Sequence, residues 1–239
     1  MFEFKHIDVI ILSGGKGSRL RSVIKDRPKP MAEINQRPFL EILISYLSTF
    51  GLSRFILSTG YKSGMIRGYF TKKEYPCLRV SEEKRLLGTG GAIKKNKRFV
   101  KNGPFLVING DSFCKVDLAD FFKFHLKNNA IASMVVAKNK RNKDCGCVKL
   151  DNRNRIKEFN EKPLSKNSGL VNCGIYLFQR EVFSLMPKRR KFSLEYDFLP
   201  GLIGMGFYGY STKDVLLDIG TPEGLKRTET YFKRLRALW

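Results

Sequence analysis

Near its N-terminus the chain carries the stretch VIILSGGKGSRL, residues 9–20. The apolar residues that open it predict a buried strand, and the glycines at 14, 15 and 17 predict a loop before a helix near Arg19. Glycines let a loop backbone approach a ligand closely, and a helix N-terminus beside an arginine attracts phosphates. Because the spacing matches neither common phosphate-loop pattern, a purely structural turn remains the alternative.

Strands and helices alternate from this unit to about residue 130. Apolar positions recur at helical spacing over 38–50, and the segment 91–99 also has the pattern of a helix. The strands expected between and after these helices are 54–59, 78–82 and 105–108. This alternation predicts a largely parallel sheet flanked by helices.

The pattern changes after residue 130, where strand-like stretches follow one another with few helices between them. These stretches are 131–137, 145–150, 155–159 and 171–178. They predict antiparallel pairing beside the first sheet. Thr221 then caps a final helix that has Pro222 in its first turn. We therefore expect one domain, residues 1–239, with a first half of about 1–130 and a second half of about 131–239.

Length and composition exclude several classes of protein. The 239 residues are 42% apolar, which excludes a disordered tail or a disulfide mini-scaffold. The early apolar run is too short for a signal peptide or a membrane span, so we expect a cytoplasmic protein with no membrane partner. Five cysteines without a C-x-x-C pair, and only two histidines, argue against a zinc site.

The charge is strongly positive, because 45 Lys and Arg face 22 Asp and Glu, a net of +23. Such a balance raises the alternative of nucleic-acid binding. The basic residues are spread along the chain, however, with local clusters at 94–98 and 188–191 and no nucleic-acid-binding motif. We therefore expect solvated basic faces and no specific nucleic acid. A third alternative is that part of the charge steers anionic substrates toward a cleft.

Three charged residues stand out by their surroundings. Lys29 lies between two prolines, which hold the backbone around it rigidly and suit an ammonium with a fixed phosphate target, although a surface lysine is the simpler alternative. Asp111 follows a buried strand in the sequence Asn109-Gly110-Asp111, at the strand end where open α/β sheets bind ligands. Asp218 likewise follows an apolar strand and precedes the N-terminus of a helix. The two aspartates could share one Mg²⁺.

Taken together, these motifs resemble the sugar-1-phosphate nucleotidyltransferase family, whose opening loop has the form G-G-x-G-[TS]-R-L. The resemblance covers nearly the whole chain. The matching segments, in the order of the family, are Gly14–Leu20, Pro28–Met31, Leu87–Ala92, Asn109–Asp111, Glu161–Pro163, Asn172–Tyr176 and Asp218–Thr221. Within the family, residues 23–32 and the short length look most like D-glycero-D-manno-heptose 1-phosphate guanylyltransferases. Because few residues follow Asp218, we expect no C-terminal β-helix domain of the kind that larger relatives carry.

The resemblance implies a Rossmann-like α/β fold, that of the nucleotide-diphospho-sugar transferases. It has a mostly parallel mixed sheet flanked by helices, with an antiparallel sugar-binding portion. The reaction it implies is attack by a sugar 1-phosphate on a nucleoside triphosphate, giving an NDP-sugar and pyrophosphate for surface-glycan biosynthesis. It also implies Mg²⁺ as the cofactor. A non-catalytic nucleotide-sugar sensor is the alternative from another class, and the sequence leaves open whether the chain forms a homo-oligomer.

Roles transfer to this chain by motif position. The resemblance implies that Arg19, Lys29 and Lys162 are catalytic, with Lys162 on the sugar phosphate, and that Asp111 and Asp218 bind the metal. The implied nucleotide-binding residues are Leu12, Gly14, Gly15, Gly17, Ser18, Arg19, Lys29, Glu83, Gly88, Thr89, Asn109 and Gly110. The implied sugar-binding residues are Gly146, Glu161, Lys162, Asn172 and Thr221, of which Thr221 is also explained by its helix cap.

The base preference depends on an acidic residue before the second glycine loop. Glu83 lies five residues before Gly88, a spacing at which relatives place a side chain against the base edge. A carboxylate there accepts hydrogen bonds from guanine N1–H and its amino group, which favours GTP. Glu82 is adjacent, so the choice between the two depends on strand register. Other nucleotides and another sugar, such as mannose or glucose 1-phosphate, are the alternatives.

Overall fold

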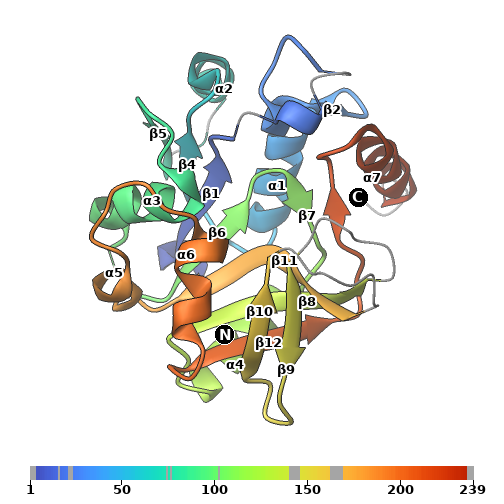
Figure 1. Ribbon diagram of the computed structural model, residues 1–239. Coiled ribbons are helices and arrows are strands. Elements are labelled where there is room, and N and C mark those ends of the chain that lie inside the picture. The colour runs from blue at the N-terminus through green and yellow to red at the C-terminus, as the bar shows by residue number, and fades with distance from the viewer. Residues whose placement is uncertain are drawn as a thin grey trace.

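The computed structural model describes residues 4–15, 17–20, 24–73, 75, 77–101, 103–139, 146–161 and 169–235. Within these residues nine strands form one mixed sheet, with strand order β10-β9-β11-β6-β1-β4-β5 and with β8 and β12 joined beside β11 (Figure 1). The sheet combines a parallel portion from the first half of the chain with a mainly antiparallel portion from the second, as the sequence predicted.

The parallel portion comes from the alternating segments near the N-terminus. Its strands are β1 (Asp8–Ser13), β4 (Arg54–Thr59), β5 (Cys77–Glu82) and β6 (Phe105–Asn109). β1 lies in the middle, with Val9 beside Phe55 on one side and Leu106 on the other. Because all four strands run the same way, their carboxyl ends meet at one edge of the sheet.

The second portion is built around the long strand β11 (Gly169–Phe178). β11 is antiparallel to β6, β8 and β9, and so continues the sheet. The other strands are β8 (Ala132–Asn139), β9 (Cys147–Leu150), β10 (Ile156–Asn160) and β12 (Phe207–Thr212). The sequence did not predict β12, since glycines interrupt its apolar pattern. A Cβ on Gly209 would lie 2.6 Å from Leu150, so this glycine lets β12 pack closely.

Helices cover both faces of the sheet. Figure 1 shows α3, α5 and α6 on the left and α7 on the right. The α-helices are α1 (Phe39–Ser48), α2 (Ser63–Phe70), α3 (Gly88–Lys95), α4 (Leu118–Lys127), α5 (Val182–Leu185), α6 (Leu194–Asp197) and α7 (Pro222–Leu235). Short 3-10 helices span Phe4–His6, Ser18–Leu20, Lys29–Met31, Asn96–Phe99 and Leu199–Leu202.

Side chains of successive strand residues point to opposite faces, and this divides the core in two. Val9 and Ile11 of β1 belong to the cluster under α1, α2 and α4. Ile10, between them, belongs to the cluster under α3, α5 and α6. All three side chains are fully buried, which explains why β1 is a continuous apolar run rather than an alternating one.

The helix expected near Arg19 is described only in part. The chain after the glycine loop makes a 3-10 turn over Ser18–Leu20, with the N–H of Leu20 donating to the carbonyl of Gly17. The N–H of Ile24 donates to the carbonyl of Leu20 at 2.9 Å, and residues 21–23 lie outside the described residues. The described groups that can attract phosphate here are the loop N–H groups and Arg19.

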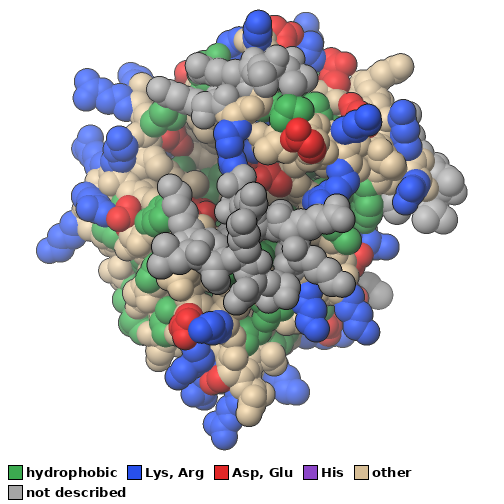
Figure 2. Space-filling model, turned by 45° about the vertical axis from the view of Figure 1, so that its right-hand side comes forward, with side chains coloured by type: hydrophobic (Ala, Val, Ile, Leu, Met, Phe, Trp, Pro, Cys, Tyr) green, Lys and Arg blue, Asp and Glu red, His purple; other side chains and the backbone are tan. Residues whose placement is uncertain are grey.

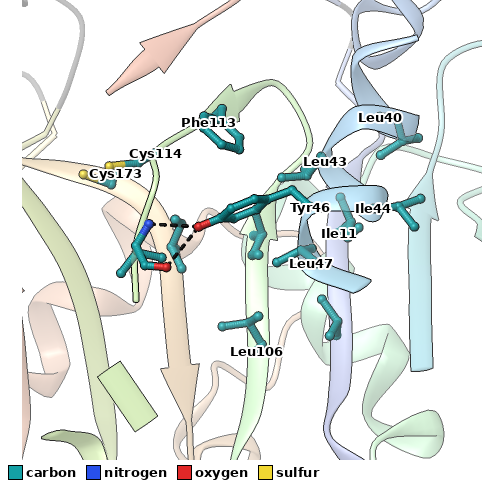
Figure 3. Close-up of a cluster of buried hydrophobic side chains, with 14 of the residues drawn as sticks. Ile11, Leu40, Leu43, Ile44, Tyr46, Leu47, Leu106, Phe113, Cys114 and Cys173 are labelled. Atoms are coloured by element: carbon teal, nitrogen blue, oxygen red, sulfur yellow. Dashed lines mark hydrogen bonds between the residues drawn. The ribbon is translucent and has the colours of Figure 1, made fainter. Parts of the chain in front are cut away.

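Buried Tyr46 connects α1 to the chain that follows the carboxyl end of β6 (Figure 3). Its Oη accepts a hydrogen bond from the N–H of Val116 and donates to the carbonyl of Val116, both at 3.0 Å. Its ring contacts Phe113 edge-on, with ring centroids 4.9 Å apart. Burial raises the pKa of Tyr46 to about 12, so the hydroxyl keeps its proton. Tyr46 thus holds the segment after Asp111 against the core.

The surface carries the excess of basic residues in dispersed form. Lysine and arginine side chains are scattered over the face in Figure 2, interspersed with acidic and hydrophobic ones. Among the described residues, no helix is long and apolar enough to cross a membrane.

Candidate active site

Lys29 forms the centre of a charge cluster at the carboxyl edge of the sheet. Its Nζ lies 2.8 Å from Oδ2 of Asp111 and 3.1 Å from Oδ1 of Asp218. The lysine side chain is only 9% exposed. Burial would lower the pKa of Lys29, but the two carboxylates outweigh burial and raise it. The ammonium therefore stays charged between two negative groups.

Two short strands bring the aspartates together. β7 (Ser112–Phe113) pairs antiparallel with β13 (Leu217–Asp218), and Asp218 lies opposite Ser112. The N–H of Ile219 donates to the carbonyl of Asp111 at 3.1 Å. The carboxylate of Asp218 is also oriented, since its Oδ1 accepts from the N–H of Gly220 at 2.6 Å. Backbone contacts thus hold the main chain at Asp111 and the carboxylate of Asp218.

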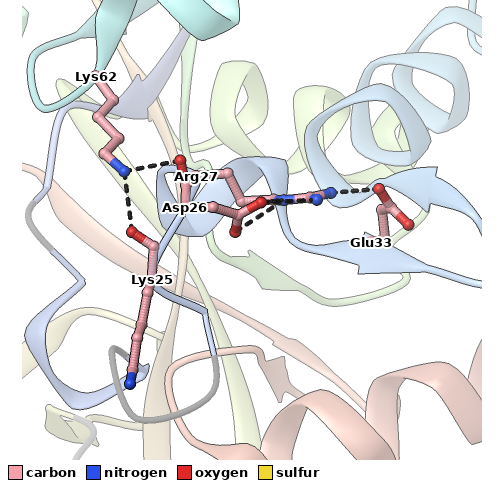
Figure 4. A network of polar contacts seen from close by, with 5 residues as sticks. All are labelled: Lys25, Asp26, Arg27, Glu33 and Lys62. Carbon is pink, nitrogen blue, oxygen red and sulfur yellow. Dashed lines mark hydrogen bonds and ion pairs between the residues drawn. The ribbon is translucent and has the colours of Figure 1, made fainter.

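The segment before Lys29 is held by a polar network that Figure 4 shows. Lys62 Nζ donates to the carbonyls of Lys25 and Asp26, at 2.9 and 2.7 Å. Arg27 forms ion pairs with Asp26 and Glu33. The 3-10 helix Lys29–Met31 follows directly, with Pro30 in its first turn. This network and the prolines together aim Lys29 inward.

Three adjoining cavities open around Asp111, which lines all of them. The Glu83 cavity, of about 280 Å³, is lined by Leu12, Gly14, Gly15, Ser58, Glu83, Leu86, Gly88, Thr89, Ala92, Asn109 and Asp111. The Arg19 cavity, of about 200 Å³, is lined by Leu12, Ser13, Gly15, Gly17, Arg19, Lys29, Pro30, Asp111 and Gly220. The Glu161 cavity, of about 150 Å³, is lined by Arg19, Lys29, Asn109, Asp111, Ser112, Gly146, Glu161, Asn172, Cys173, Gly174, Glu195, Leu216 and Asp218.

Glycines make the approach of these elements feasible. Gly17 has φ +58, and a Cβ on it would lie 2.9 Å from Cβ of Lys29. Gly174 has φ +70, and a Cβ there would lie 2.6 Å from Nδ2 of Asn109. At both positions the backbone conformation and the close contact require glycine.

The Glu83 cavity contains a buried carboxylate. Oε2 of Glu83 accepts from the N–H of Leu87 at 2.9 Å, and Oε1 accepts from Oγ of Ser58 at 3.4 Å. Burial raises the pKa of Glu83, although the Leu87 hydrogen bond and the charge of Lys95 act against it. Glu82, by contrast, faces outward and pairs with Arg67 at 2.7 Å. The register therefore turns Glu83 toward the cavity.

The Glu161 cavity is lined by the carboxylates of Glu161 and Glu195 in addition to those of the two aspartates. Oε2 of Glu161 is buried and has no hydrogen-bond partner within the described part of the chain. Burial, aided by the negative charge of Glu195, raises the pKa of Glu161 to about 7. Asn172 lines the same cavity, and its Nδ2 donates to Oη of Tyr176 at 2.7 Å. Gly146 is needed beside Glu161, because a Cβ on it would lie 2.6 Å from Oε2.

Most of the expected site residues that the structure describes line these cavities, but two do not. Gly110 packs at the end of β6, where a Cβ would lie 2.6 Å from Oγ of Ser13. Thr221 caps α7, since its Oγ1 accepts from the N–H of Gly224 at 3.1 Å. Lys162 and the side chain of Ser18 lie outside the described residues.

Glu195, which the sequence did not indicate as a site residue, connects two of the cavities. Its Oε2 accepts from Oγ1 of Thr89 at 2.6 Å and from Oγ of Ser193 at 2.9 Å. Thr89 lines the Glu83 cavity, whereas Glu195 lines the Glu161 cavity. The signal was weak, because α6 has four residues and shows no periodicity. The only clue is the capping serine two residues earlier.

The two aspartates fit a divalent metal. Their carboxylates converge on one point, and Mg²⁺ in phosphate-transferring sites commonly takes one or two carboxylates plus substrate oxygens and waters. Among the described residues, no group of three or more His, Cys, Asp or Glu could hold a metal without such additional ligands. The donor set therefore suits an ion that binds together with a phosphate substrate.

Comparison with known proteins agrees with this arrangement. A family model described as Nucleotidyl transferase matches residues 8–232. D-glycero-alpha-D-manno-heptose 1-phosphate guanylyltransferase of Campylobacter jejuni is 39% identical over 219 residues, 91% of this chain and 96% of the relative. The enzyme of that name from Aneurinibacillus thermoaerophilus is 36% identical over 225 residues, 93% of this chain and 97% of the relative.

A solved structure shares the fold. HddC from Yersinia pseudotuberculosis is 34% identical, with a TM-score of 0.85, covering 95% of this chain and 99% of that chain. Its complex with GMP-PN gives a TM-score of 0.83 at 33% identity, with the same coverage. The expected α/β fold of nucleotide-diphospho-sugar transferases is thus confirmed.

Proposed function

We propose that this chain, which belongs to the nucleotidyl transferase family, is a guanylyltransferase that joins GTP to D-glycero-alpha-D-manno-heptose 1-phosphate. The products are a GDP-heptose and pyrophosphate. Two relatives of nearly the same length carry this activity in their names, and the related HddC was solved with the guanine nucleotide GMP-PN.

The observation that carries the base assignment is the buried carboxylate of Glu83. Each of its oxygens already accepts one hydrogen bond from the protein and has a further lone pair for the ligand. Guanine presents two adjacent donors, N1–H and the amino group, which match a carboxylate with its two acceptors. Adenine and the pyrimidines do not present that pair of donors.

The proposed reaction needs charge neutralisation more than acid–base chemistry, because the attacking sugar phosphate is already ionised. Its oxygen forms a bond to the α-phosphorus of GTP, and the bond from that phosphorus to the bridging oxygen breaks, releasing pyrophosphate. Arg19 and Lys29 line the cavity beside the glycine loop and hold the phosphate oxygens. Bringing two anions into contact is the main barrier, and fixed positive charges lower it.

Asp111 and Asp218 would hold Mg²⁺, which supplies further positive charge to the phosphates when it is bound. Lys29 lies between the same carboxylates. In the proposed complex its ammonium turns from the aspartates to the triphosphate. The positive charge that the protein presents to the reacting phosphorus therefore increases as the substrate enters.

The sugar is proposed to lie in the Glu161 cavity. Glu161 accepts hydrogen bonds from sugar hydroxyls through Oε2, which has no hydrogen-bond partner among the described residues. Asn172 and the backbone at Gly146 provide further polar contacts beside it. Lys162 follows Glu161 in the family motif, and we propose that it grips the sugar phosphate. A polyhydroxylated sugar satisfies this lining, whereas an apolar group would leave the carboxylate buried without a partner.

Pyrophosphate release with Mg²⁺ tests this function. We expect release from GTP with the heptose 1-phosphate, and little from ATP, CTP, UTP or dTTP. Glu83→Gln should lower kcat/KM for GTP about a hundredfold, because an amide presents only one acceptor to guanine. Glu82→Gln is the matched control and should leave kcat/KM for GTP unchanged. Use of another nucleotide would overturn the base assignment, and use of GTP with mannose 1-phosphate alone would overturn the sugar assignment.

A further inference from the structure

Behind Glu83 lies a chain of buried polar side chains that the proposed reaction does not itself use. Ser58 is at the carboxyl end of β4, and Asn96 follows α3. Both are buried, at 1% and 0% exposure. Nδ2 of Asn96 lies 3.1 Å from Oγ of Ser58, which in turn lies 3.4 Å from Oε1 of Glu83. The three groups form a line that leads from the core to the cavity.

The direction of these hydrogen bonds follows from their chemistry. Nδ2 of Asn96 also lies 2.9 Å from the carbonyl of Ala92, which can only accept. The atom facing both Ala92 and Ser58 is therefore the amide nitrogen, and it donates to each of them. Since Oγ of Ser58 accepts from Asn96, its own proton is directed to Glu83. The carboxylate thus receives a donor of fixed orientation.

The other oxygen of Glu83 is fixed independently. Oε2 accepts from the N–H of Leu87 in the turn before α3. A carboxylate held at both oxygens cannot rotate about its terminal torsion, which is otherwise soft. Its two remaining lone pairs then keep one plane, as recognition of two adjacent donors on a base requires.

We infer that Ser58 and Asn96 are positioning residues for Glu83, and that they set the preference of the enzyme for guanine over bases that lack its amino group. This inference rests on the proposed function, since it concerns the same cavity and base. Ser58 and Asn96 act through the carboxylate. Loss of either side chain lets the Oε1 side of the Glu83 carboxylate turn. This weakens a contact with the two donors of guanine more than a contact with the single donor of hypoxanthine.

Inosine triphosphate is the probe, because hypoxanthine keeps N1–H and lacks the amino group. We expect the wild-type enzyme to prefer GTP over ITP in kcat/KM. Ser58→Ala should lower that preference about fivefold, mostly through the KM for GTP, since one hydrogen bond to a charged group is lost. Asn96→Leu keeps a similar side-chain volume and should lower the preference for GTP over ITP by a smaller factor. Calorimetric binding of GTP and ITP should change in parallel.

Thr59→Val is the matched control. Thr59 is the next residue of β4, is equally buried, and its Oγ1 has no hydrogen-bond partner among the described residues. It should leave the GTP to ITP ratio unchanged. A merely structural effect of Ser58→Ala would lower activity with both nucleotides equally. A ratio within about twofold of wild type for both Ser58→Ala and Asn96→Leu would therefore overturn the inference.

The same measurements separate this inference from the function on which it rests. Equal use of GTP and ITP by the wild-type enzyme would overturn the two-donor contact of Glu83 and the positioning role, whereas failure to use GTP would overturn the proposed function itself. A wild-type preference for GTP that Ser58→Ala and Asn96→Leu both retain overturns the positioning role alone. Thermal unfolding of each variant confirms that it is folded, and if Ser58→Ala does not fold, Asn96→Leu carries the test.

Discussion

Nζ of Lys29 lies 3.1 Å from Oδ1 of Asp218, although 189 residues separate them in the chain. The same ammonium reaches Asp111, 82 residues away. Lysine thus lies where the two carboxylates would otherwise repel each other, and where a divalent cation would also bind. In the proposed metal site, a cation entering between the aspartates would displace Lys29. Metal entry would then release a positive charge toward the substrate.

Replacing Lys29 by Met should separate these two roles. Removing the ammonium leaves two unneutralised carboxylates, so Mn²⁺ should bind about tenfold more tightly in the absence of nucleotide. Turnover should fall about a hundredfold, because a positive charge near the transferred phosphorus is lost. Titration with Mn²⁺ followed by electron paramagnetic resonance measures the first effect. Unchanged Mn²⁺ affinity would contradict competition between the lysine and the metal.

Asp111→Asn should abolish metal-dependent turnover and leave the fold intact. The amide keeps the size of the side chain but removes the negative charge that holds the cation, so we expect a loss of about a hundredfold or more. Pyrophosphate release over a range of Mg²⁺ concentrations measures it. Asp214→Asn, at an exposed position of the 213–215 loop, is the control. A variant at position 111 with wild-type activity would refute this metal site.

Glu161→Gln should stabilise the substrate-free protein in a pH-dependent way. The pKa of Glu161 is raised to about 7, so the native state holds its proton where the unfolded chain has lost it. This group therefore lowers stability as pH rises from about 4.5 to 7. At pH 8 the variant should melt at least about 2 °C above wild type, and near pH 4.5 the difference should disappear.

The same variant should have a raised KM for the sugar phosphate, because a hydroxyl acceptor is lost. Glu158→Gln, on the exposed side of β10 and paired with Lys149, controls for surface charge. It should have no comparable effect at either pH. Equal melting of Glu161→Gln and wild type at pH 8 would show that the carboxylate is not strained by burial.

His125 should make the fold sensitive to acid. It is fully buried, with Nδ1 at 2.8 Å from Oγ of Ser133 and Nε2 at 3.2 Å from Nε2 of Gln179. Burial lowers the pKa of His125 to about 4, so the unfolded chain takes up this proton first as pH falls. The contribution of His125 to the free energy of unfolding is therefore complete above about pH 6.5. It is lost as pH falls from about 6.5 to 4, and it amounts to about 3 kcal/mol.

Urea unfolding between pH 5 and 7.5 measures this contribution. His125→Gln should be less stable than wild type at pH 7 and should have a flatter dependence on pH. His6→Gln, at an exposed position, should keep the wild-type dependence. An unchanged slope for His125→Gln would assign the acid sensitivity to other groups.

Local patterns predicted most of the elements. The apolar run at 9–12, the periodicity of 38–50 and the glycine loops indicated the parallel half, because a strand or helix is recognisable within a few residues. They failed at β12, where Gly209 breaks the apolar pattern. There, packing against other segments outweighed local preference.

The sequence by itself determined the family and the chemical types available to the site: glycines near phosphate, a lysine between prolines, and acids after apolar strands. Only the tertiary structure decided which of these groups meet. Pairing of β7 with β13 brings Asp111 to Asp218, and the register of β5 turns Glu83 inward and Glu82 out. The contact of Thr89 with Glu195, across 106 residues, had no local signature. Such contacts depend on strand order and register, which no short stretch of chain encodes.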